Sequence, residues 1–278
     1  MDILAKLLRR DRIVIPVIRL SGAIGMAMPL RGGLTISTVA APLKRAFSHR
    51  TAPAVAIIIN SPGGSPVQSH LIHRRIRSLA DEHGKQVLVF VEDVAASGGY
   101  LIALAGDEII VDASSIVGSI GVVSAGFGFH RLLERIGIER RVHTAGEKKV
   151  ILDPFQPERP EDVARLEALQ REVHQDFIDL VKARRGGRLA NDPDLFSGAF
   201  WSGSRGVTLG LVDRIGDITA VLRERFGQNV VLKPIAFERK FWRRRFSMPG
   251  VASGEPGGMI GEVLSVLDER ALWSRFGL

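Results

Sequence analysis

The chain has 278 residues, 45% of them hydrophobic, and contains no cysteine. This length suffices for one large core, and the absence of thiols excludes disulfides, thiolate metal sites and cysteine catalysis. The net charge of +8 comes without a pattern of interleaved aromatic and basic residues, so we expect no nucleic-acid partner. No segment has the ~18 uninterrupted apolar residues of a membrane span, so we expect a cytoplasmic protein without a transmembrane helix.

The first half of the sequence alternates between strand-like and helix-like segments. After a short lead at residues 1–11, apolar runs rich in β-branched residues predict strands at 13–20, 53–59, 86–91 and 108–111. Amphipathic segments between them predict helices at 38–48 and 66–83. This order implies right-handed parallel crossovers and therefore an α/β core.

The second predicted helix has a clear start signal. Ser65 is the expected N-cap, Pro66 suits the first helical position, and Gln68 completes a capping box. The glycine-rich turn before this helix and the turn around Ser97 both follow a predicted strand. We therefore expect both turns at the carboxyl edge of the sheet, where ligands bind in open α/β folds.

The second half predicts mostly helices, with short strands at 140–143 and 229–232. The helices are expected at 129–136, 160–185, 204–210 and 217–226. The long helix at 160–185 is amphipathic, and its expected inward residues are Val163, Leu166, Val173, Phe177 and Leu180. We expect a catalytic domain at 12–236, followed by a basic linker and a C-terminal helix at 237–278.

Ser97 is the first candidate for chemistry. It stands at a strand-to-helix junction and is followed by Gly98 and Gly99, which permit backbone conformations that a side chain would forbid. A nucleophilic serine and a plain tight turn are equally compatible with this segment alone. A serine nucleophile needs a base, for which His130 and Lys149 are candidates. Lys149 precedes the apolar residues 150–152, which would carry it into a dry site, whereas most lysines are simply exposed.

Four motifs occur together in one order and spacing. They are INSPGGS at 59–65, ASGGY at 96–100, GSIGV at 118–122, and AGEKK at 145–149 leading to DPF at 153–155. With a weaker fifth match, GLVDRIG at 210–216, they make the sequence resemble the S49 peptidases of the signal peptide peptidase A and SohB type, over roughly residues 12–225. The resemblance implies a Clp/crotonase-like α/β fold, a βαβ spiral with a mostly parallel sheet, here followed by the basic C-terminal appendage.

The resemblance also implies a serine–lysine dyad. Ser97 matches the nucleophile and Lys149 matches the general base, while Lys148 is one position away and is the weaker candidate. Ser119 matches the serine that hydrogen-bonds the lysine and helps to keep it neutral. The remaining implied site residues are Gly63 or Gly64 with Gly98 for the oxyanion hole, and Gly121 and Asn60 for the substrate.

By the same resemblance, the substrates are extended peptides with small or apolar side chains next to the cut. No cofactor and no metal are implied. In family members this short, serine and lysine meet across a subunit boundary, so we expect a homo-oligomer with shared active sites. Typical members carry an N-terminal membrane anchor, and we expect none in this sequence. The run at 239–246, with Trp242 among arginines, suits peripheral contact with an anionic inner membrane, or equally a solvated tail or inter-subunit arm.

Three alternatives remain. A crotonase-type acyl-CoA enzyme would need carboxylates near the site, and the turn around Ser97 offers none. A Clp-type serine–histidine–aspartate protease would use His130 as its base. A catalytically inactive scaffold that binds a membrane or partners would leave Ser97 unreactive.

Overall fold

The computed structural model describes residues 12–25, 33–146, 148–237 and 270–277. Their strands form one eight-stranded sheet, in which β6-β5-β3-β2-β1-β8 lie side by side and β4 pairs with β3 and β7. All pairings are parallel except that of β5 with β6. The strands are β1 Val14–Ser21, β2 Ala54–Ser61, β3 Gln86–Ala96, β4 Glu108–Val111, β5 Ile116–Gly118, β6 Phe200–Ser202, β7 Arg214–Ile215 and β8 Val231–Pro234. This architecture confirms the predicted α/β class with a mostly parallel sheet.

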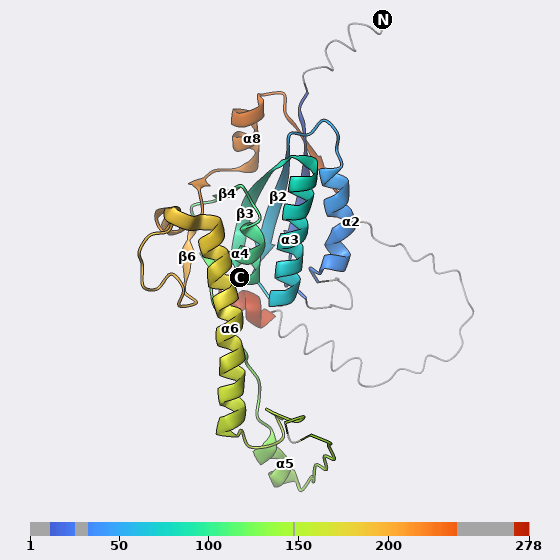
Figure 1. Cartoon of the computed structure of the whole chain (residues 1–278), viewed down its shortest axis with the longest axis vertical. Coiled ribbons are helices and arrows are strands. Elements are labelled where there is room, and N and C mark those ends of the chain that lie inside the picture. The colour runs from blue at the N-terminus through green and yellow to red at the C-terminus, as the bar shows by residue number, and fades with distance from the viewer. Residues whose placement is uncertain (1–11, 26–32, 147, 238–269, 278) are drawn as a thin grey trace, which may run out of the picture.

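The helices lie at or within a few residues of the predicted positions, and one short helix follows Ser97 directly. They are α2 Ile36–Phe47, α3 Pro66–His83, α4 Gly98–Ala103, α5 His130–Ile136, α6 Pro160–Arg185, the 3-10 turn η1 Gly186–Arg188, α7 Gly203–Thr208 and α8 Ile218–Phe226. Helices α2 and α3 lie side by side over one face of the sheet, and α8 lies near its upper end (Figure 1).

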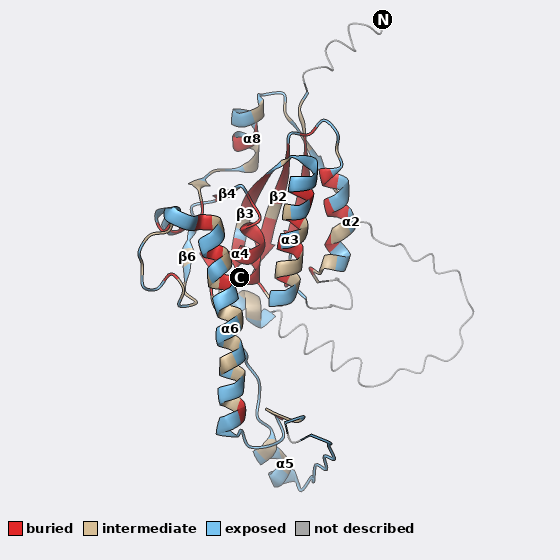
Figure 2. Cartoon of the chain, in the orientation of Figure 1, coloured by how far each residue is buried: buried red, intermediate tan, exposed pale blue. Residues whose placement is uncertain are grey.

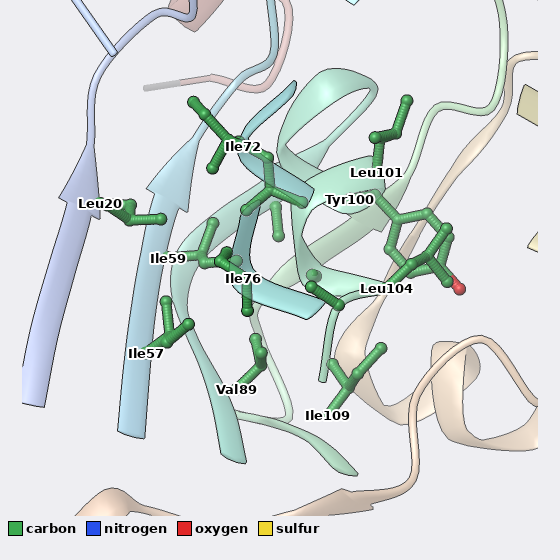
Figure 3. Packing of buried hydrophobic residues seen from close by; sticks show 14 of the residues in the cluster. Leu20, Ile57, Ile59, Ile72, Ile76, Val89, Tyr100, Leu101, Leu104 and Ile109 are labelled. Atoms are coloured by element: carbon green, nitrogen blue, oxygen red, sulfur yellow. The ribbon is translucent and has the colours of Figure 1, made fainter. Parts of the chain in front are cut away.

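The larger of two core clusters lies between the sheet and the helices α2, α3 and α4. Ile57, Ile59 and Val89 point from β2 and β3 toward Ile72 and Ile76 of α3, and all five are fully buried (Figure 3). Tyr100 of α4 is also buried, and its hydroxyl donates to the Leu211 carbonyl at 2.7 Å. Burial raises the pKa of Tyr100, so its hydroxyl stays protonated and acts as a structural donor.

Strand β3 places Ser97 because it changes partner along its length. Its residues Leu88–Val91 pair with β4, whereas Val94–Ala96 pair with β5. The pairing with β2 shifts register between Ile59 and Ser61, which is a local irregularity of the ladder. The strand therefore leaves one neighbour, continues beside another, and ends directly at the turn that holds Ser97.

Helix α6 differs from its prediction in what it packs against. Of the five residues expected to face inward, only Phe177 is buried, and Val163, Leu166, Val173 and Leu180 are half-exposed. The N-terminal half of α6 projects beyond the sheet, and α5 lies at its far end (Figure 1). Together with residues 124–159 this half forms what we call the arm, whose surface is mostly exposed (Figure 2). The helix is amphipathic, but its apolar stripe finds no core to cover along the arm.

Two further local predictions are wrong. Residues 140–143 form no strand, because they lie in the arm, where the sheet offers no neighbour. Ser65 does cap α3 by accepting from the Gln68 backbone N–H at 3.4 Å, but no capping box closes. The Gln68 side chain instead accepts from the Ile36 backbone N–H at 2.9 Å and so joins α3 to the start of α2.

The expected lead at 1–11 and the basic run at 239–246 lie outside the described residues. Within the described ranges, no helix is both long enough and apolar enough to cross a membrane. The chain's end returns to the domain: residues 270–274 form a helical turn, and the Phe276 ring meets that of Phe200 in β6 edge-on, with centroids 5.2 Å apart.

Candidate active site

Ser97 occupies a strained turn. Its φ of 51° and ψ of −121° are rare for a residue with a side chain, and such positions persist where surrounding contacts hold them. Its backbone N–H donates to the Gly118 carbonyl at 2.8 Å, which ties the turn to β5. Although Ser97 is the N-cap of α4, its hydroxyl makes no capping bond. The hydroxyl is therefore available for another partner.

The turn at Gly63 and Gly64 packs directly against the Ser97 turn. A Cβ added to Gly63 would lie 2.8 Å from the Ser97 Cβ and 3.1 Å from the Gly98 nitrogen. Gly63 also has a φ of 107°, which disfavours any side chain. A Cβ on Gly64 would collide with the backbone of Ile24. Gly63 thus needs glycine because the Ser97 turn approaches it closely, and Gly64 needs glycine because the backbone at Ile24 does.

The backbone donors expected for an oxyanion hole lie in these two turns. The Gly63 N–H makes a long bond of 3.3 Å to Ser61 Oγ. Among the described residues, the N–H groups of Gly64 and Gly98 donate to no acceptor within the chain. Free, preorganised N–H groups beside a serine are what a developing oxyanion requires.

Two cavities adjoin Ser97. One has a volume of about 300 Å³ and is lined by Ser97, Ser119, Gly121, Val122, Val123, His174, Ser197, Gly198 and Arg275. The other is small, about 20 Å³, and is lined mainly by apolar groups, namely Gly64, Pro66, His70, Gly98, Leu101, Gly121, Val122, Val173 and Phe177, besides Ser97 itself. The structure therefore brings the predicted Ser97, Ser119 and Gly121 together. His174 and Arg275, which the sequence analysis missed, lie in the same cavity.

Ser119 and His174 both adjoin the segment that follows β5. Ser119 is 5% exposed, has a φ of 52°, and donates its N–H to the Ala199 carbonyl at 2.7 Å. His174 Nε2 lies 2.9 Å from the carbonyl oxygen of Ile120. Half-buried His70 lines the smaller cavity, and its pKa is lowered by burial and by the nearby charge of Arg74. His70 is therefore mostly neutral near pH 7.

Asn60 has a structural place in the described chain. Its side-chain N–H donates to Asp93 at 2.6 Å, and its side-chain oxygen accepts from the Val94 N–H at 3.3 Å. These bonds join the end of β2 to β3 where their register shifts. Because both ends of the amide are occupied, contact between the Asn60 side chain and substrate stays a prediction.

The structure does not bring either predicted base to Ser97 within one chain. Lys149 and Lys148 are exposed, in the segment that joins α5 to α6 on the arm (Figure 1). His130 begins α5, also on the arm, and lines a separate cavity of about 720 Å³ together with Asp153. Neither cavity at Ser97 includes Lys149 or His130. The described residues also contain no cluster of three or more metal-binding side chains.

Asp153, which follows Lys149 in the predicted motif, anchors this part of the arm. Its carboxylate pairs with Arg140 and accepts from the Phe155 N–H at 3.0 Å. The Arg140 guanidinium lies 4.7 Å from the centre of the Phe155 ring. These contacts hold the arm's end together although it lies away from the main core.

Two family profiles and two relatives agree in indicating a protease. Residues 80–229 match the profile described as Peptidase family S49, and residues 2–133 match that of ClpP-like SDH-type serine proteinases, in line with the predicted Clp-type fold. The chloroplastic serine protease SPPA of Arabidopsis thaliana is 31% identical over 75% of this chain and 31% of its own length. The putative protease slr0021 of Synechocystis is 32% identical over 66% of this chain and 67% of its own.

One relative that is more similar to this chain than these proteases carries the name of a different kind of protein. The Na(+)/H(+) antiporter NhaA of Brucella melitensis is 57% identical over 97% of this chain, but the match covers only 38% of that protein. This chain thus spans about two fifths, or less, of the first relatives it matches. A solved structure of a membrane-bound stomatin-specific protease, 1510-N, aligns with 81% of this chain and 98% of its own, at 16% identity and a TM-score of 0.49.

Proposed function

Because the chain belongs to peptidase family S49, a family of serine peptidases, we propose that it is an endopeptidase whose nucleophile is Ser97 and whose base is Lys149. The observation that carries the proposal is the Ser97 turn. Its strained backbone presents an unbonded hydroxyl between two cavities, beside the free N–H groups of Gly64 and Gly98.

In the proposed reaction, neutral Lys149 takes the proton of the Ser97 hydroxyl as Oγ bonds to the substrate carbonyl carbon. The electron pair of the carbonyl moves to its oxygen, which the N–H groups of Gly64 and Gly98 stabilise. When the C–N bond breaks, the lysine returns its proton to the leaving amine. Water then attacks the acyl-enzyme by the same route and releases the second product.

We propose that Lys149 reaches Ser97 of a neighbouring copy. This explains why both residues are present in one sequence while Lys149 is exposed on the arm. The arm also exposes large apolar side chains that a second copy would cover, among them Phe127 at 78%, Leu132 at 53% and Ile136 at 56%. A homo-oligomer would thus complete the site and bury the arm.

The proposed substrates are extended peptides with small or apolar residues next to the cut. The smaller cavity at Ser97 is nearly filled by its apolar lining, including Leu101 and Phe177, which suits a small side chain. The backbone at Gly121 lines the larger cavity and offers a place for strand-like pairing with a peptide backbone. A crotonase-type reaction has less support, because neither cavity at Ser97 is lined by a carboxylate.

Mixing two inactive variants tests both the dyad and its sharing. Ser97→Ala and Lys149→Ala should each abolish peptide cleavage, while Lys148→Ala, the matched control, should retain it. If each site combines Ser97 of one copy with Lys149 of the next, random mixing of the two inactive variants should restore about one quarter of wild-type activity. Complementation that stays at the background level in mixed oligomers would refute sharing. Retained activity in Lys149→Ala would refute the dyad, and an unreactive Ser97 would favour a scaffold.

A further inference from the structure

We propose that His174 of α6 is a positioning residue that orients the peptide edge at Gly121 for substrate binding. This inference rests on the proposed peptidase function, but it concerns a residue outside the motifs that indicate that function. His174 lines the 300 Å³ cavity together with Ser97 and Ser119. His174 lies 77 positions after Ser97 in the sequence, so only the fold brings the two residues to the same cavity.

The hydrogen bond of His174 has only one possible direction. Its Nε2 lies 2.9 Å from the Ile120 carbonyl oxygen, and a carbonyl can only accept. His174 therefore carries its proton on Nε2 and donates it to Ile120. Ile120 is fully buried, so water does not readily replace this donor.

This bond sets the direction of the next N–H group. The peptide between Ile120 and Gly121 is planar and trans, so the Ile120 C=O and the Gly121 N–H point in opposite directions. Holding the carbonyl toward α6 therefore directs the Gly121 N–H away from α6. Among the described residues, that N–H donates to no acceptor in the chain. It is thus an oriented donor of the kind that pairs with the carbonyl of an extended peptide.

The residues around the peptide between Ile120 and Gly121 leave its orientation dependent on His174. On one side, the Ser119 N–H is fixed by the Ala199 carbonyl at 2.7 Å. On the other, a Cβ on Gly121 would lie 3.0 Å from the Gly198 Cα, so little more than backbone separates the two segments. No side chain at position 121 or 198 packs to hold the peptide plane. Phe177, one turn later in α6, is 5% exposed and anchors the helix independently.

The test compares three variants and two reactions. His174→Met removes the donor at similar volume, and His174→Gln retains a side-chain N–H near the position of Nε2. Gln175→Met is the matched control, because it breaks only an exposed 2.8 Å bond to Asp179 on the same helix. Each variant is measured with an extended fluorogenic peptide and by the rate at which a small fluorophosphonate labels Ser97, which needs no extended backbone.

We expect His174→Met to raise the KM for the peptide about five-fold, as loss of one oriented hydrogen bond would, while the labelling rate stays within about two-fold of wild type. His174→Gln should restore most of the affinity, and Gln175→Met should match wild type. An unchanged KM in a folded His174→Met variant would overturn the inference, as would an equal loss of labelling, which would indicate a merely structural role.

Two controls keep the outcomes separate. Should His174→Met fail to fold, as shown by its melting temperature, His174→Asn gives the same comparison, because its shorter side chain carries a donor that falls short of Ile120. If Ser97→Ala retains both peptide cleavage and labelling, the proposed function fails, whatever the His174 variants do. If Ser97→Ala abolishes both while the His174 variants bind peptide normally, only the positioning role fails.

Discussion

Helix α3 and the Ser97 turn lie so close together that a side chain added at Gly98 should reduce activity. Gly98 follows Ser97, the proposed nucleophile, and its backbone conformation is one that alanine can adopt, so only space limits a substitution. A Cβ at position 98 would overlap Ser69 Oγ and lie 3.3 Å from Ile24 Cδ1. Because Ser69 is fully buried and its Oγ is bonded to the Ser65 carbonyl, we expect the Ser97 turn rather than the hydroxyl to move, by about 1 Å, to restore an ordinary contact. A shift of this size in a catalytic group typically costs about 10²-fold in rate, so Gly98→Ala should lose about that factor in kcat/KM.

A second substitution should reverse the effect. Ser69→Ala removes the overlapping oxygen and leaves the Ser69 Cβ 3.4 Å from the added methyl group, an ordinary contact. It also removes the 2.9 Å bond from Ser69 Oγ to the Ser65 carbonyl, at a cost of about 1 kcal/mol in stability. Ser69→Ala alone should therefore lower the melting temperature but retain most of the activity. The double variant should recover most of the activity that Gly98→Ala loses.

The assay is a double-mutant cycle on peptide cleavage, with melting temperatures measured in parallel. Wild-type activity in Gly98→Ala would show that the close approach is not needed. A double variant as inactive as Gly98→Ala would show that the loss has a cause other than the overlap with Ser69. Either result would refute the steric reasoning, while leaving the identity of the nucleophile to the Ser97 variants.

Three further predictions concern stability and access. Burial above all, with the charge of Arg184, lowers the pKa of His73 from 6.5 to about 4. The folding stability that depends on neutral His73 is therefore complete above pH 6.5 and is lost as the pH falls to 4. Urea titrations should show a loss of about 3 kcal/mol over that range, absent in His73→Leu. Burial raises the pKa of Asp213, but hydrogen bonds from Arg185 and the Ile109 N–H outweigh it and lower the pKa. Asp213→Asn should therefore reduce the free energy of unfolding by about 3 kcal/mol at neutral pH. The same titrations should show a progressively smaller loss as acid protonates the wild-type carboxylate. Because Arg275 lines the cavity at Ser97, a chain shortened after residue 269 should cleave peptides with a lower KM, and an unchanged KM would show that this segment does not compete with substrate.

The local elements of the fold follow from the sequence because their signals are local. The apolar run at 53–59 becomes β2, buried between β1 and β3, and Ser65 caps α3 as its position predicts. A turn at Ser97 is likewise predictable from a strand, a serine and two glycines in succession, whereas its strained backbone is held by distant contacts such as the bond to the Gly118 carbonyl. Family membership follows from several such short motifs in order.

Contacts between distant segments are decided only by the tertiary structure. The partner of the Gln68 side chain is Ile36, 32 residues away, and no local pattern favours it over the capping box. His174 and Arg275 reach the cavity at Ser97 because α6 and the end of the chain pack there, and the motifs that mark the site include neither residue. The residues 140–143 carry a strand-like pattern but lie on the arm, with no sheet neighbour to receive their hydrogen bonds.

The two residues of the proposed dyad show the same difference between what the sequence predicts and what the tertiary structure decides. The sequence alone identifies Ser97 and Lys149 as candidates, because each lies in a short motif whose residue types suit its chemistry. The structure confirms the predicted place of Ser97 at the carboxyl edge of the sheet, and it alone shows that Lys149 is exposed on the arm. Local residue patterns determine what a group can do, whereas packing of remote segments determines which groups meet it.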